Sequence, residues 1–483
     1  MNIKIVGRTI GRIILIEGLF MLPALLLSLI ERDFSVSIAY VQTLAIMLGT
    51  SGVLLIVGRR SGETFFAQEG FVTVALCWVI FAVMGCLPFF LSGQIPSFID
   101  ALFESISGFT TTGASILSNV EAMSRSLLYW RSFTHWLGGM GILVFALAVV
   151  SDKNSGGTFH LMKAESPGPS VGKLTPRLRD TATILYGIYI AMTVLCFLFL
   201  LVGGMPLFDS LCTAFGTAGT GGFGIKNDSM VSYSPYLQNV CTVFMALFGV
   251  NFSIYYLLLL RRFTDILHDE ELRWYLLIMF GATAAISWNI LPLVGNLGDS
   301  IQQAAFQVSS IMTTTGFSTV DFNLWPTFSK AVLMGLMLLG ACAGSTGGGF
   351  KVIRLILIIK DLKRNIRRIL RPRSVIVMRV SGQPIDHQTM RGVNCFLSAY
   401  VILIVVSVAI VSLEPYSLET TISAVFACFN NIGPGLDTVG PTANFSMLSN
   451  LSKLVLSADM LLGRLEIFPI LALFSRYSWR QNL

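Results

Sequence analysis

The chain has 483 residues, of which 54% are hydrophobic and 12% are charged, and its formal net charge is +7. A soluble domain carries about 25% charged residues, so this composition excludes an ordinary soluble protein and predicts an integral membrane protein. A membrane β-barrel would show alternating segments of ~10 residues. The sequence lacks such segments, and we therefore expect the spans to be helices.

Ten segments of the chain are apolar over roughly the 20 residues that a spanning helix needs. We expect spanning helices at 9–30, 37–58, 70–91, 126–150, 181–203, 236–260, 273–294, 328–359, 394–412 and 448–475. No small-residue cleavage site follows the first apolar run, so no cleavable signal peptide is expected. The eight cysteines lie in or beside apolar segments without C-x-x-C spacing, and we expect neither disulfides nor a zinc site.

The basic residues indicate the orientation of these spans. Lys and Arg are concentrated near the N-terminus and at 59–60, 151–180, 261–273, 360–393 and 476–483. By the positive-inside rule these segments are cytoplasmic, so both termini are expected in the cytoplasm. The positive charge reflects this topology and indicates an attraction for anionic lipid or for an acidic surface of a partner, and it does not suggest nucleic-acid binding.

Each pair among the last eight spans encloses a shorter, mildly apolar stretch that ends in a glycine. The four stretches read FIDALFESISGFTTTGAS, LFDSLCTAFGTAGTGGFG, AFQVSSIMTTTGFST and ISAVFACFNNIGPGL, and they align on Gly113, Gly222, Gly316 and Gly433. An acidic residue stands upstream in each repeat, namely Asp100, Asp209, Asp299 and Glu419. Stretches of this length are typical of re-entrant segments rather than spans.

The repeat predicts the architecture. We expect an all-α integral membrane protein in which two N-terminal helices precede four helix–re-entrant pore loop–helix repeats, arranged with pseudo-fourfold symmetry around one pore. The expected units are an N-terminal extension at 1–60 and pore repeats at 61–150, 151–262, 263–373 and 374–483.

The glycine stretches have the chemistry of a cation filter. Glycine lets the backbone turn so that successive carbonyls face an axis, and rings of carbonyls can replace the hydration shell of a cation. The short helix before each stretch points its negative C-terminal end at the same axis, and its acidic start could concentrate cations at the outer mouth. Alternatively, Thr and Gly pack helices closely, but four stretches in register favour a filter.

The sequence also resembles the Trk/Ktr/HKT superfamily of potassium and sodium transporters over nearly its whole length. The resemblance rests on the four glycine stretches and on GACAGSTGGGFKVIRL (340–355), AESPGP (164–169), NNIGPGL (430–436) and LLGRLEIFP (461–469). The two extra N-terminal helices are similar to the TrkH/TrkG-like branch. The resemblance implies K⁺ uptake across the bacterial inner membrane by a homodimer with one pore per chain, controlled by a cytosolic, TrkA-like nucleotide-binding subunit. It implies K⁺ as the substrate and no organic cofactor on this chain.

The resemblance assigns the ion site to backbone carbonyls beside the four glycines. The matching residues are Thr111, Thr112, Gly113, Thr220, Gly221, Gly222, Thr314, Thr315, Gly316, Asn431, Ile432 and Gly433. Glycine at all four key positions resembles the K⁺-selective members, since Na⁺-preferring relatives have serine at the first. Only the first and third stretches keep TTTG, so we expect weaker discrimination between K⁺ and Na⁺ than in a symmetric tetramer. A Na⁺-permeable or Na⁺/H⁺-coupled transporter of the same superfamily is the alternative.

A flexible stretch lies within the long apolar segment 328–359. Its consecutive glycines should break a helix, because each costs about 1 kcal/mol relative to alanine. The resemblance implies an intramembrane gating loop beneath the filter, made of Gly344, Ser345, Thr346, Gly347, Gly348 and Gly349. A kink between packed helices is the other interpretation.

Arg464 lies inside the last apolar segment, where a charge costs roughly 2.5–3.5 kcal/mol and needs a partner. The expected partners are the carbonyls of 343–349, Glu466 or Asp459. Below the filter, the charge of Arg464 would be a barrier to cations. The alternative is a structural ion pair between Arg464 and Glu466.

The basic segment 360–373 extends the helix behind the glycine loop. Topology and lipid headgroups would explain its charge, and docking of the regulatory subunit is the functional alternative. The loop 151–180 is the other sizeable cytosolic segment.

Other function classes fit less well. The four histidines, His135, His160, His268 and His387, are scattered and show no catalytic pattern, so we expect no enzyme, and His135 is expected to be a packing residue. A proton-coupled transporter of organic solutes would need ionisable residues at the bilayer midplane, for which Arg464, Glu466 and Asp459 are the good candidates. A non-conducting scaffold would not need four glycine loops in register.

Overall fold

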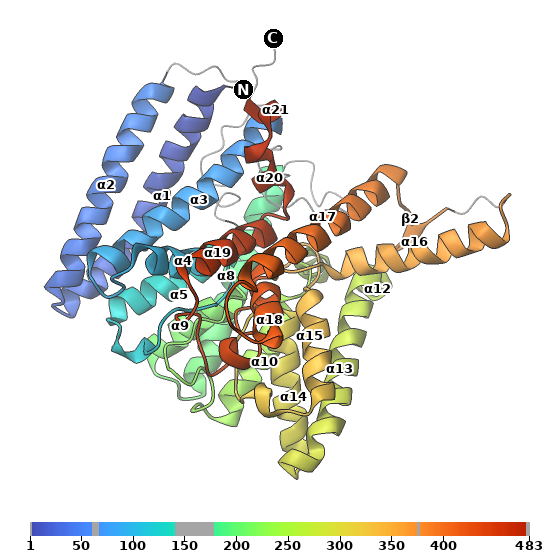
Figure 1. The fold of residues 1–483 in the computed structure, drawn as a ribbon. Coiled ribbons are helices and arrows are strands. Elements are labelled where there is room, and N and C mark those ends of the chain that lie inside the picture. The colour runs from blue at the N-terminus through green and yellow to red at the C-terminus, as the bar shows by residue number, and fades with distance from the viewer. Residues whose placement is uncertain (1, 60–66, 140, 142–177, 374–376, 480–483) are drawn as a thin grey trace.

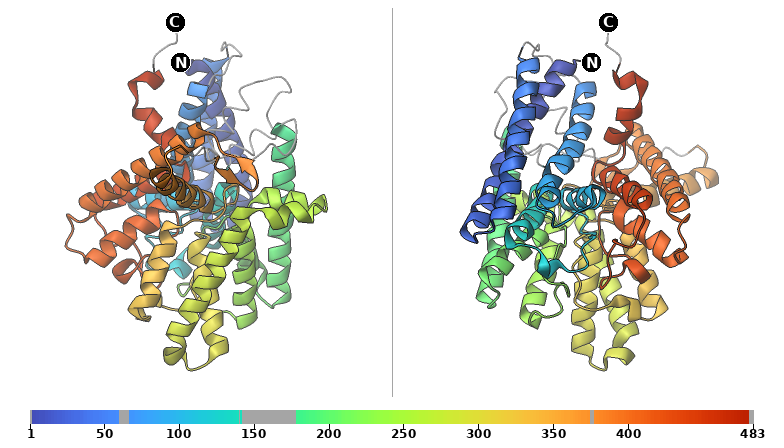
Figure 2. Two further views of the ribbon diagram at one scale, coloured as in Figure 1. Left: turned by 90° about the vertical axis from the view of Figure 1, so that its right-hand side faces the viewer. Right: turned by 60° about the vertical axis from the view of Figure 1, so that its left-hand side comes forward.

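The structure is a computed structural model that describes residues 2–59, 67–139, 141, 178–373 and 377–479. Figure 1 shows a bundle of helices of unequal length, with the hairpin of α1 and α2 at one side and α16 projecting from the other. The start of α1 and the short helix α21 lie at the same end of the molecule in every view (Figures 1 and 2). The only strands in the described residues form a two-stranded antiparallel hairpin, β1 (Arg379–Val380) and β2 (Gln383–Pro384).

Six of the described helices are long and apolar enough to span a membrane without a break. They are α1 (Ile3–Ile30), α2 (Phe34–Gly58), α3 (Ala67–Leu91), α8 (Leu178–Val202), α13 (Glu270–Val294) and α17 (His387–Val411). Large apolar side chains on their outer faces are exposed, such as Phe280 at 68% and Trp288 at 78%. Because such faces are stable only against lipid, the predicted all-α integral membrane class is confirmed.

Four shorter helices enter the bundle between the spanning helices. They are α4 (Phe98–Phe109), α9 (Leu207–Ala218), α14 (Leu297–Met312) and α18 (Leu418–Phe429). Each carries an acidic residue in its first turn, where the helix dipole favours negative charge. Apolar side chains of these helices are themselves buried: Phe103 and Phe109 of α4 are 0% and 1% exposed. Because these short helices lie among longer spanning helices, their C-terminal ends lie inside the protein.

The second helix of the last three predicted repeats differs from the prediction, because it does not run on as one span. In the first repeat, the second helix is α5 (Arg125–Gly139), and residues 140 and 142–150 of the predicted helix lie outside the described residues. The other three are divided into α10 (Pro235–Phe248) and α11 (Phe252–Leu259), α15 (Thr327–Leu338) and α16 (Val352–Leu370), and α19 (Asn450–Arg464) and α20 (Phe468–Phe474). Continuous helices at 236–260 and 448–475 were therefore wrong, whereas the break in 328–359 was expected from its glycines.

The causes of these breaks lie in packing. Helices α10 and α11 are bent by 90° because backbone from the third repeat enters between them: Cys342 N–H donates to Gly249 O at 3.0 Å, and Phe252 N–H to Gly344 O at 3.0 Å. Between α19 and α20, Glu466 and Ile467 adopt positive φ angles of 54° and 69°. A group that inserts between the backbone hydrogen bonds of a helix is a common cause of kinks.

The remaining helical elements are short. They are α12 (Phe263–His268), α21 (Arg476–Trp479) and the 3₁₀ turns Val120–Ala122, Phe322–Leu324 and Asp437–Val439. The predicted AESPGP stretch at 164–169, His160 and most of the loop 151–180 lie outside the described residues.

Two glycines hold α5 and α19 against the ends of short helices. A methyl group on Gly138 would lie 1.9 Å from the carbonyl oxygen of Phe109, and one on Gly463 would lie 1.9 Å from that of Phe429. No Cβ fits at that distance, so these two glycines allow the close approach of α5 to α4 and of α19 to α18.

Replacing Gly138 with alanine should therefore destabilise the protein. Overpacking of this kind costs about 1–3 kcal/mol, and we expect a lower midpoint of thermal unfolding for Gly138→Ala in detergent. Gly335→Ala in α15 is the matched control, since its methyl group would have no atom within 4 Å. Equal midpoints for the two variants would contradict this packing.

Candidate functional site: a ring of four glycine loops

All four short helices end in the same backbone motif. In each, the second residue after the last helical one adopts a left-handed conformation: Thr111, Thr220, Thr314 and Asn431 have φ angles of 56°, 52°, 59° and 56°. The next N–H donates back into the last turn at 2.8 Å in every case, for example from Thr112 to Ser107 O. This is the Schellman arrangement. It reverses the direction of the chain, and the carbonyl oxygens that follow accept none of its hydrogen bonds.

The non-glycine residues in this motif carry strain. A β-branched threonine at positive φ is an outlier, and such a residue costs of order 1–3 kcal/mol. The predicted glycines Gly113, Gly222, Gly316 and Gly433 follow two residues later and also have positive φ, from 73° to 99°. Backbone held in such conformations at four places must be fixed by its surroundings, and strain of this kind clusters at functional sites.

The four glycine loops meet in a closed ring. A methyl group on Gly113 would lie 2.1 Å from Gly221 O, and one on Gly222 would lie 2.0 Å from Thr315 O. The same holds for Gly316 against Ile432 O at 2.1 Å, and Gly433 against Thr112 O at 2.7 Å. Each glycine therefore abuts the carbonyl that precedes the glycine of the next loop, and the fourth loop returns to the first. The structure brings all twelve predicted loop residues together.

The carbonyl oxygens of this ring lack hydrogen bonds. Within the described chain, no N–H or O–H donates to the carbonyl oxygens of Thr111, Thr112, Thr220, Gly221, Thr314, Thr315, Asn431 or Ile432. All eight residues are buried. More than 90% of buried backbone carbonyls have a partner, so eight free ones in one ring need an explanation.

The side chains of the ring bond to the scaffold. Thr112 Oγ1 accepts from Asn431 Nδ2 at 2.9 Å and lies 2.8 Å from Thr110 Oγ1. Thr315 Oγ1 likewise lies 2.8 Å from Thr313 Oγ1. The hydroxyls of Thr112 and Thr315 are therefore occupied by hydrogen bonds to other side chains. Among the ring residues of the described chain, the side-chain oxygens without a partner are Thr111 Oγ1 and Asn431 Oδ1, beside the eight backbone carbonyls.

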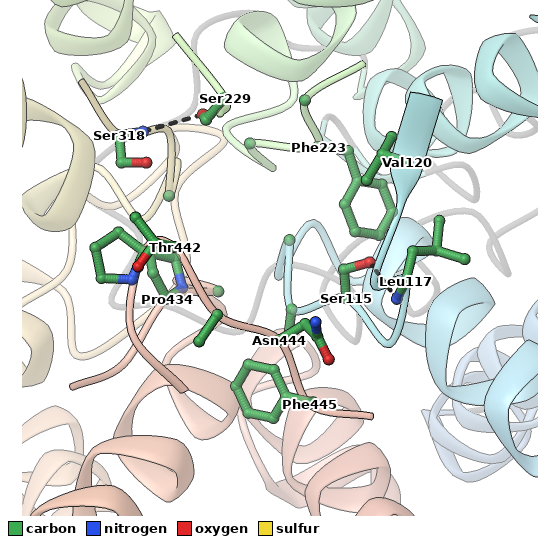
Figure 3. A pocket seen from close by; sticks show the side chains of 18 of the residues that line it. Ser115, Leu117, Val120, Phe223, Ser229, Ser318, Pro434, Thr442, Asn444 and Phe445 are labelled. Carbon is green, nitrogen blue, oxygen red and sulfur yellow. Dashed lines mark hydrogen bonds between the residues drawn. The ribbon is translucent and has the colours of Figure 1, made fainter. Parts of the chain in front are cut away.

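A cavity opens on one side of the ring (Figure 3). All four glycines line it, together with loop residues such as Ser115, Ser318 and Asn444. Its charged lining residues are Arg131 and Lys226. Nearby, hydrogen bonds from Ser417 and Thr420 lower the pKa of Asp437, which keeps a negative charge on that exposed loop.

The acidic residues at the starts of the short helices do not all present free charge. Asp100 pairs with Lys453 at 2.6 Å, and Glu419 pairs with Lys330 at 3.2 Å. Asp209 accepts from the hydroxyl of Tyr233 at 2.9 Å. These contacts fix the N-terminal ends of the short helices in addition to complementing their dipoles.

Glu104 and Arg131 form a buried pair behind the first loop that the sequence analysis missed. Arg131 Nε lies 2.6 Å from Glu104 Oε1, and the two side chains are 3% and 0% exposed. Glu104 also accepts from Ser115 Oγ and Ile116 N–H, both at 2.9 Å. Arg131 donates to Gly224 O at 2.9 Å and so reaches the second loop. A charged residue inside each of two apolar segments was the signal that could have revealed the pair.

The predicted gating segment folds against the ring at its third loop. Gly348 N–H donates to Thr314 Oγ1 at 2.7 Å. Thr346 Oγ1 donates to Phe248 O at 3.2 Å. At the two ends of the segment, Ala343 N–H and Ile353 N–H both donate to Glu271 Oε1, at 2.7 and 3.1 Å. The segment is thus held by the third loop, by the break after α10, and by Glu271, which the sequence analysis did not single out.

Arg464 contacts one of the expected carbonyls of 343–349 and two carbonyls at the end of α5. Its guanidinium donates to Thr346 O at 2.9 Å, to Gly139 O at 2.7 Å and to Gly138 O. Arg464 therefore joins the glycine segment to the end of α5. The carboxylate of Glu466, another expected partner, is paired with Arg354. Asp459 accepts from Ser407 Oγ at 2.7 Å.

Breaking the Glu104–Arg131 pair should destabilise the protein strongly. Removing one partner of a buried ion pair costs about 3–5 kcal/mol, and we expect Glu104→Gln to lower the midpoint of thermal unfolding markedly. Glu419→Gln, in the partly exposed pair with Lys330, is the control and should cost about 1 kcal/mol or less. Similar midpoints for the two variants would contradict a supporting role for Glu104.

Comparisons with known proteins agree with this geometry. The family described as TrkH, cation transport protein, matches residues 37–480. The Trk system potassium uptake protein TrkH of Halomonas elongata is 35% identical over 487 residues, with both chains covered completely. TrkG of Escherichia coli, also named a Trk system potassium uptake protein, is 32% identical, with 99% of each chain covered.

A solved structure has the same fold. The crystal structure of the potassium transporter TrkH from Vibrio parahaemolyticus superposes with a TM-score of 0.88 at 31% identity, and the match covers 99% of this chain and 100% of that one. The chain therefore belongs to the TrkH family of cation transport proteins.

Proposed function

We propose that the protein takes up potassium across the bacterial inner membrane through a pore on the axis of the glycine-loop ring. The observation that carries this proposal is the set of eight buried carbonyl oxygens without hydrogen-bond donors in the described chain. A dehydrated K⁺ ion on the axis would satisfy them, because carbonyl oxygens can replace its hydration water. The names of the Halomonas elongata and Escherichia coli relatives, potassium uptake proteins, support K⁺ as the ion.

The units of the chain take these roles in the proposal. Residues 1–60 form a two-helix extension, and 61–150, 151–262, 263–373 and 374–483 are four pore repeats. The negative C-terminal ends of α4, α9, α14 and α18 favour a cation at the ring. Both termini lie in the cytoplasm.

The inner side of the pore is closed by the segment 344–349 and by Arg464. The segment touches the ring through Thr314, and the guanidinium of Arg464 adds a positive charge bound to the carbonyl of Thr346. A fixed positive charge inside a low-dielectric pore repels cations. Opening requires that Arg464 leave these carbonyls and that the segment move aside.

Control of this gate comes from a cytosolic, TrkA-like nucleotide-binding subunit acting on a homodimer of this chain. The basic part of α16 continues directly from the gating segment and is exposed at its apolar residues Ile369 and Leu370, at 79% and 75%. A movement of α16 would therefore be transmitted to the gate. A Na⁺-permeable or Na⁺/H⁺-coupled transporter is the second candidate, favoured by the unequal sequences of the four loops.

The ring should fail to discriminate between ions when one of its glycines gains a side chain. We expect Gly113→Ser to lower the ratio of K⁺ to Na⁺ flux, because its Cβ would overlap the carbonyl oxygen of Gly221. Flux is measured into liposomes that hold the purified protein, in K⁺, Rb⁺, Na⁺ and Li⁺ gradients, with and without the regulatory subunit.

Gly295→Ser is the matched control for Gly113→Ser. Gly295 has a positive φ of 77°, but a Cβ added to it would have no atom within 4 Å, so the ratio should stay unchanged. Equal K⁺ and Na⁺ flux through the unmodified protein would support the second candidate instead.

Removing the charge below the ring should increase leakage. We expect Arg464→Ala to raise basal K⁺ flux by about tenfold, which corresponds to lowering the barrier by roughly 1.4 kcal/mol. The control is Arg262→Ala, which removes a guanidinium exposed by 61% and paired only locally with Asp265. A fall in flux for Arg464→Ala, with normal amounts of folded protein, would refute the barrier.

A further inference from the structure

His135 joins the first short helix to the second glycine loop. The imidazole is fully buried in α5. Its Nδ1 lies 2.8 Å from the carbonyl oxygen of Gly108, and its Nε2 lies 3.2 Å from the backbone nitrogen of Phe223, the residue after Gly222. The two contacts belong to adjacent repeats, so the ring of His135 bridges them directly behind the glycine loops.

These partners determine the form of the imidazole. A backbone N–H can only donate, so Nε2 must accept from Phe223. A carbonyl oxygen can only accept, so Nδ1 must carry the hydrogen that is shared with Gly108. His135 is therefore neutral and in the Nδ1–H tautomer, the one state of the imidazole that satisfies both contacts.

The imidazole also explains why the second loop departs from the TTTG pattern. A methyl group on Gly221 would lie 2.3 Å from His135 Cγ and Nδ1. The corresponding residues of the other loops are Thr112, Thr315 and Ile432, which all have side chains. In the second loop the ring of His135 occupies the space of that side chain.

Phe223 is held from α5 by a second contact. Its ring centroid lies 4.2 Å from that of His135, and the Arg131 guanidinium carbon lies 3.5 Å from the same centroid. Arg131 and His135 are one helical turn apart on α5 and so act on the same segment. Of the two, His135 bonds to the backbone immediately beside Gly222.

The fourth repeat provides a comparison within the same chain. Gly463 of α19 packs on α18 as Gly138 of α5 packs on α4. His135 stands three residues before Gly138, and Met460 stands three residues before Gly463. Met460 is also fully buried, but it bonds to its loop through its backbone carbonyl, which accepts from Asn431 Nδ2 at 2.9 Å.

We infer that His135 is a positioning residue for ion discrimination, which acts as a neutral Nδ1–H imidazole that fixes the carbonyl of Gly221 in the ring. This inference rests on the proposed function, since discrimination is measured as ion flux. Without the bond to Phe223 N–H, the second loop can relax toward the space left beside Gly221. Its carbonyl would then fit K⁺ no better than the smaller Na⁺.

The first test compares ion ratios rather than total flux. We expect His135→Ala to lower the K⁺ to Na⁺ flux ratio in liposomes by about fivefold or more, the equivalent of one lost hydrogen bond. His135→Gln, whose amide can both donate and accept, should restore much of the ratio. Met460→Ala, which removes a buried side chain of similar size and keeps its backbone bond, should leave the ratio unchanged.

The outcomes separate the two proposals. A falling ratio in His135→Ala and Met460→Ala alike would reduce the role of His135 to packing and overturn the inference. An unchanged ratio in folded His135→Ala would overturn it as well. Absence of K⁺ flux in the unmodified protein with its regulatory subunit would instead overturn the proposed function.

A second measurement applies even if the alanine variant does not fold. Nitrogen-15 NMR of histidine-labelled protein reports the tautomer of each imidazole, and the signal that is absent from folded His135→Gln belongs to His135. We expect that signal to be the neutral Nδ1–H form. A neutral Nε2–H form or a doubly protonated ring would contradict the inference without reference to transport.

Discussion

The structure depends on one unusual condition, which is that eight backbone carbonyls lie buried at the centre of a membrane protein without hydrogen-bond donors in the described chain. Unsatisfied backbone groups are expensive at membrane depth. They persist here because four short helices end in the same Schellman motif and four glycines let the loops approach each other. The rest of the fold holds these loops so that they cannot turn to find partners of their own.

The breaks in the long helices follow from the same condition. Helices α5 and α19 must pass close to the ends of α4 and α18, which glycines at 138 and 463 allow. Between α10 and α11, and between α15 and α16, backbone from one repeat replaces the hydrogen bonds that the broken helix of another has lost. The segment beneath the ring is thus bonded to the scaffold on both sides, and the carboxylate of Glu271 secures both of its ends.

Much of this could be predicted from the sequence because the signals are periodic or repeated. Apolar length predicted the spanning helices, and four glycine stretches in register predicted the loops that the structure brings together. The prediction of continuous helices at 236–260 and 448–475 was wrong. Composition does not show where the backbone hydrogen bonds of a helix will be interrupted. Glu104, Arg131 and His135 were missed or seen only as packing, since their partners are backbone groups and residues far along the chain. The GTGG of the second loop could be understood only once the imidazole was found beside Gly221.

The central claim is that backbone carbonyls, rather than side chains, bind the ion. Crystals grown in Rb⁺ in place of K⁺ test it most directly, because the anomalous scattering of Rb⁺ locates the ion itself. We expect a peak on the axis of the ring, within coordination distance of the carbonyl oxygens of Thr112, Gly221, Thr315 and Ile432. A ring without such a peak, with Rb⁺ bound instead at side-chain oxygens elsewhere in the pore, would contradict it.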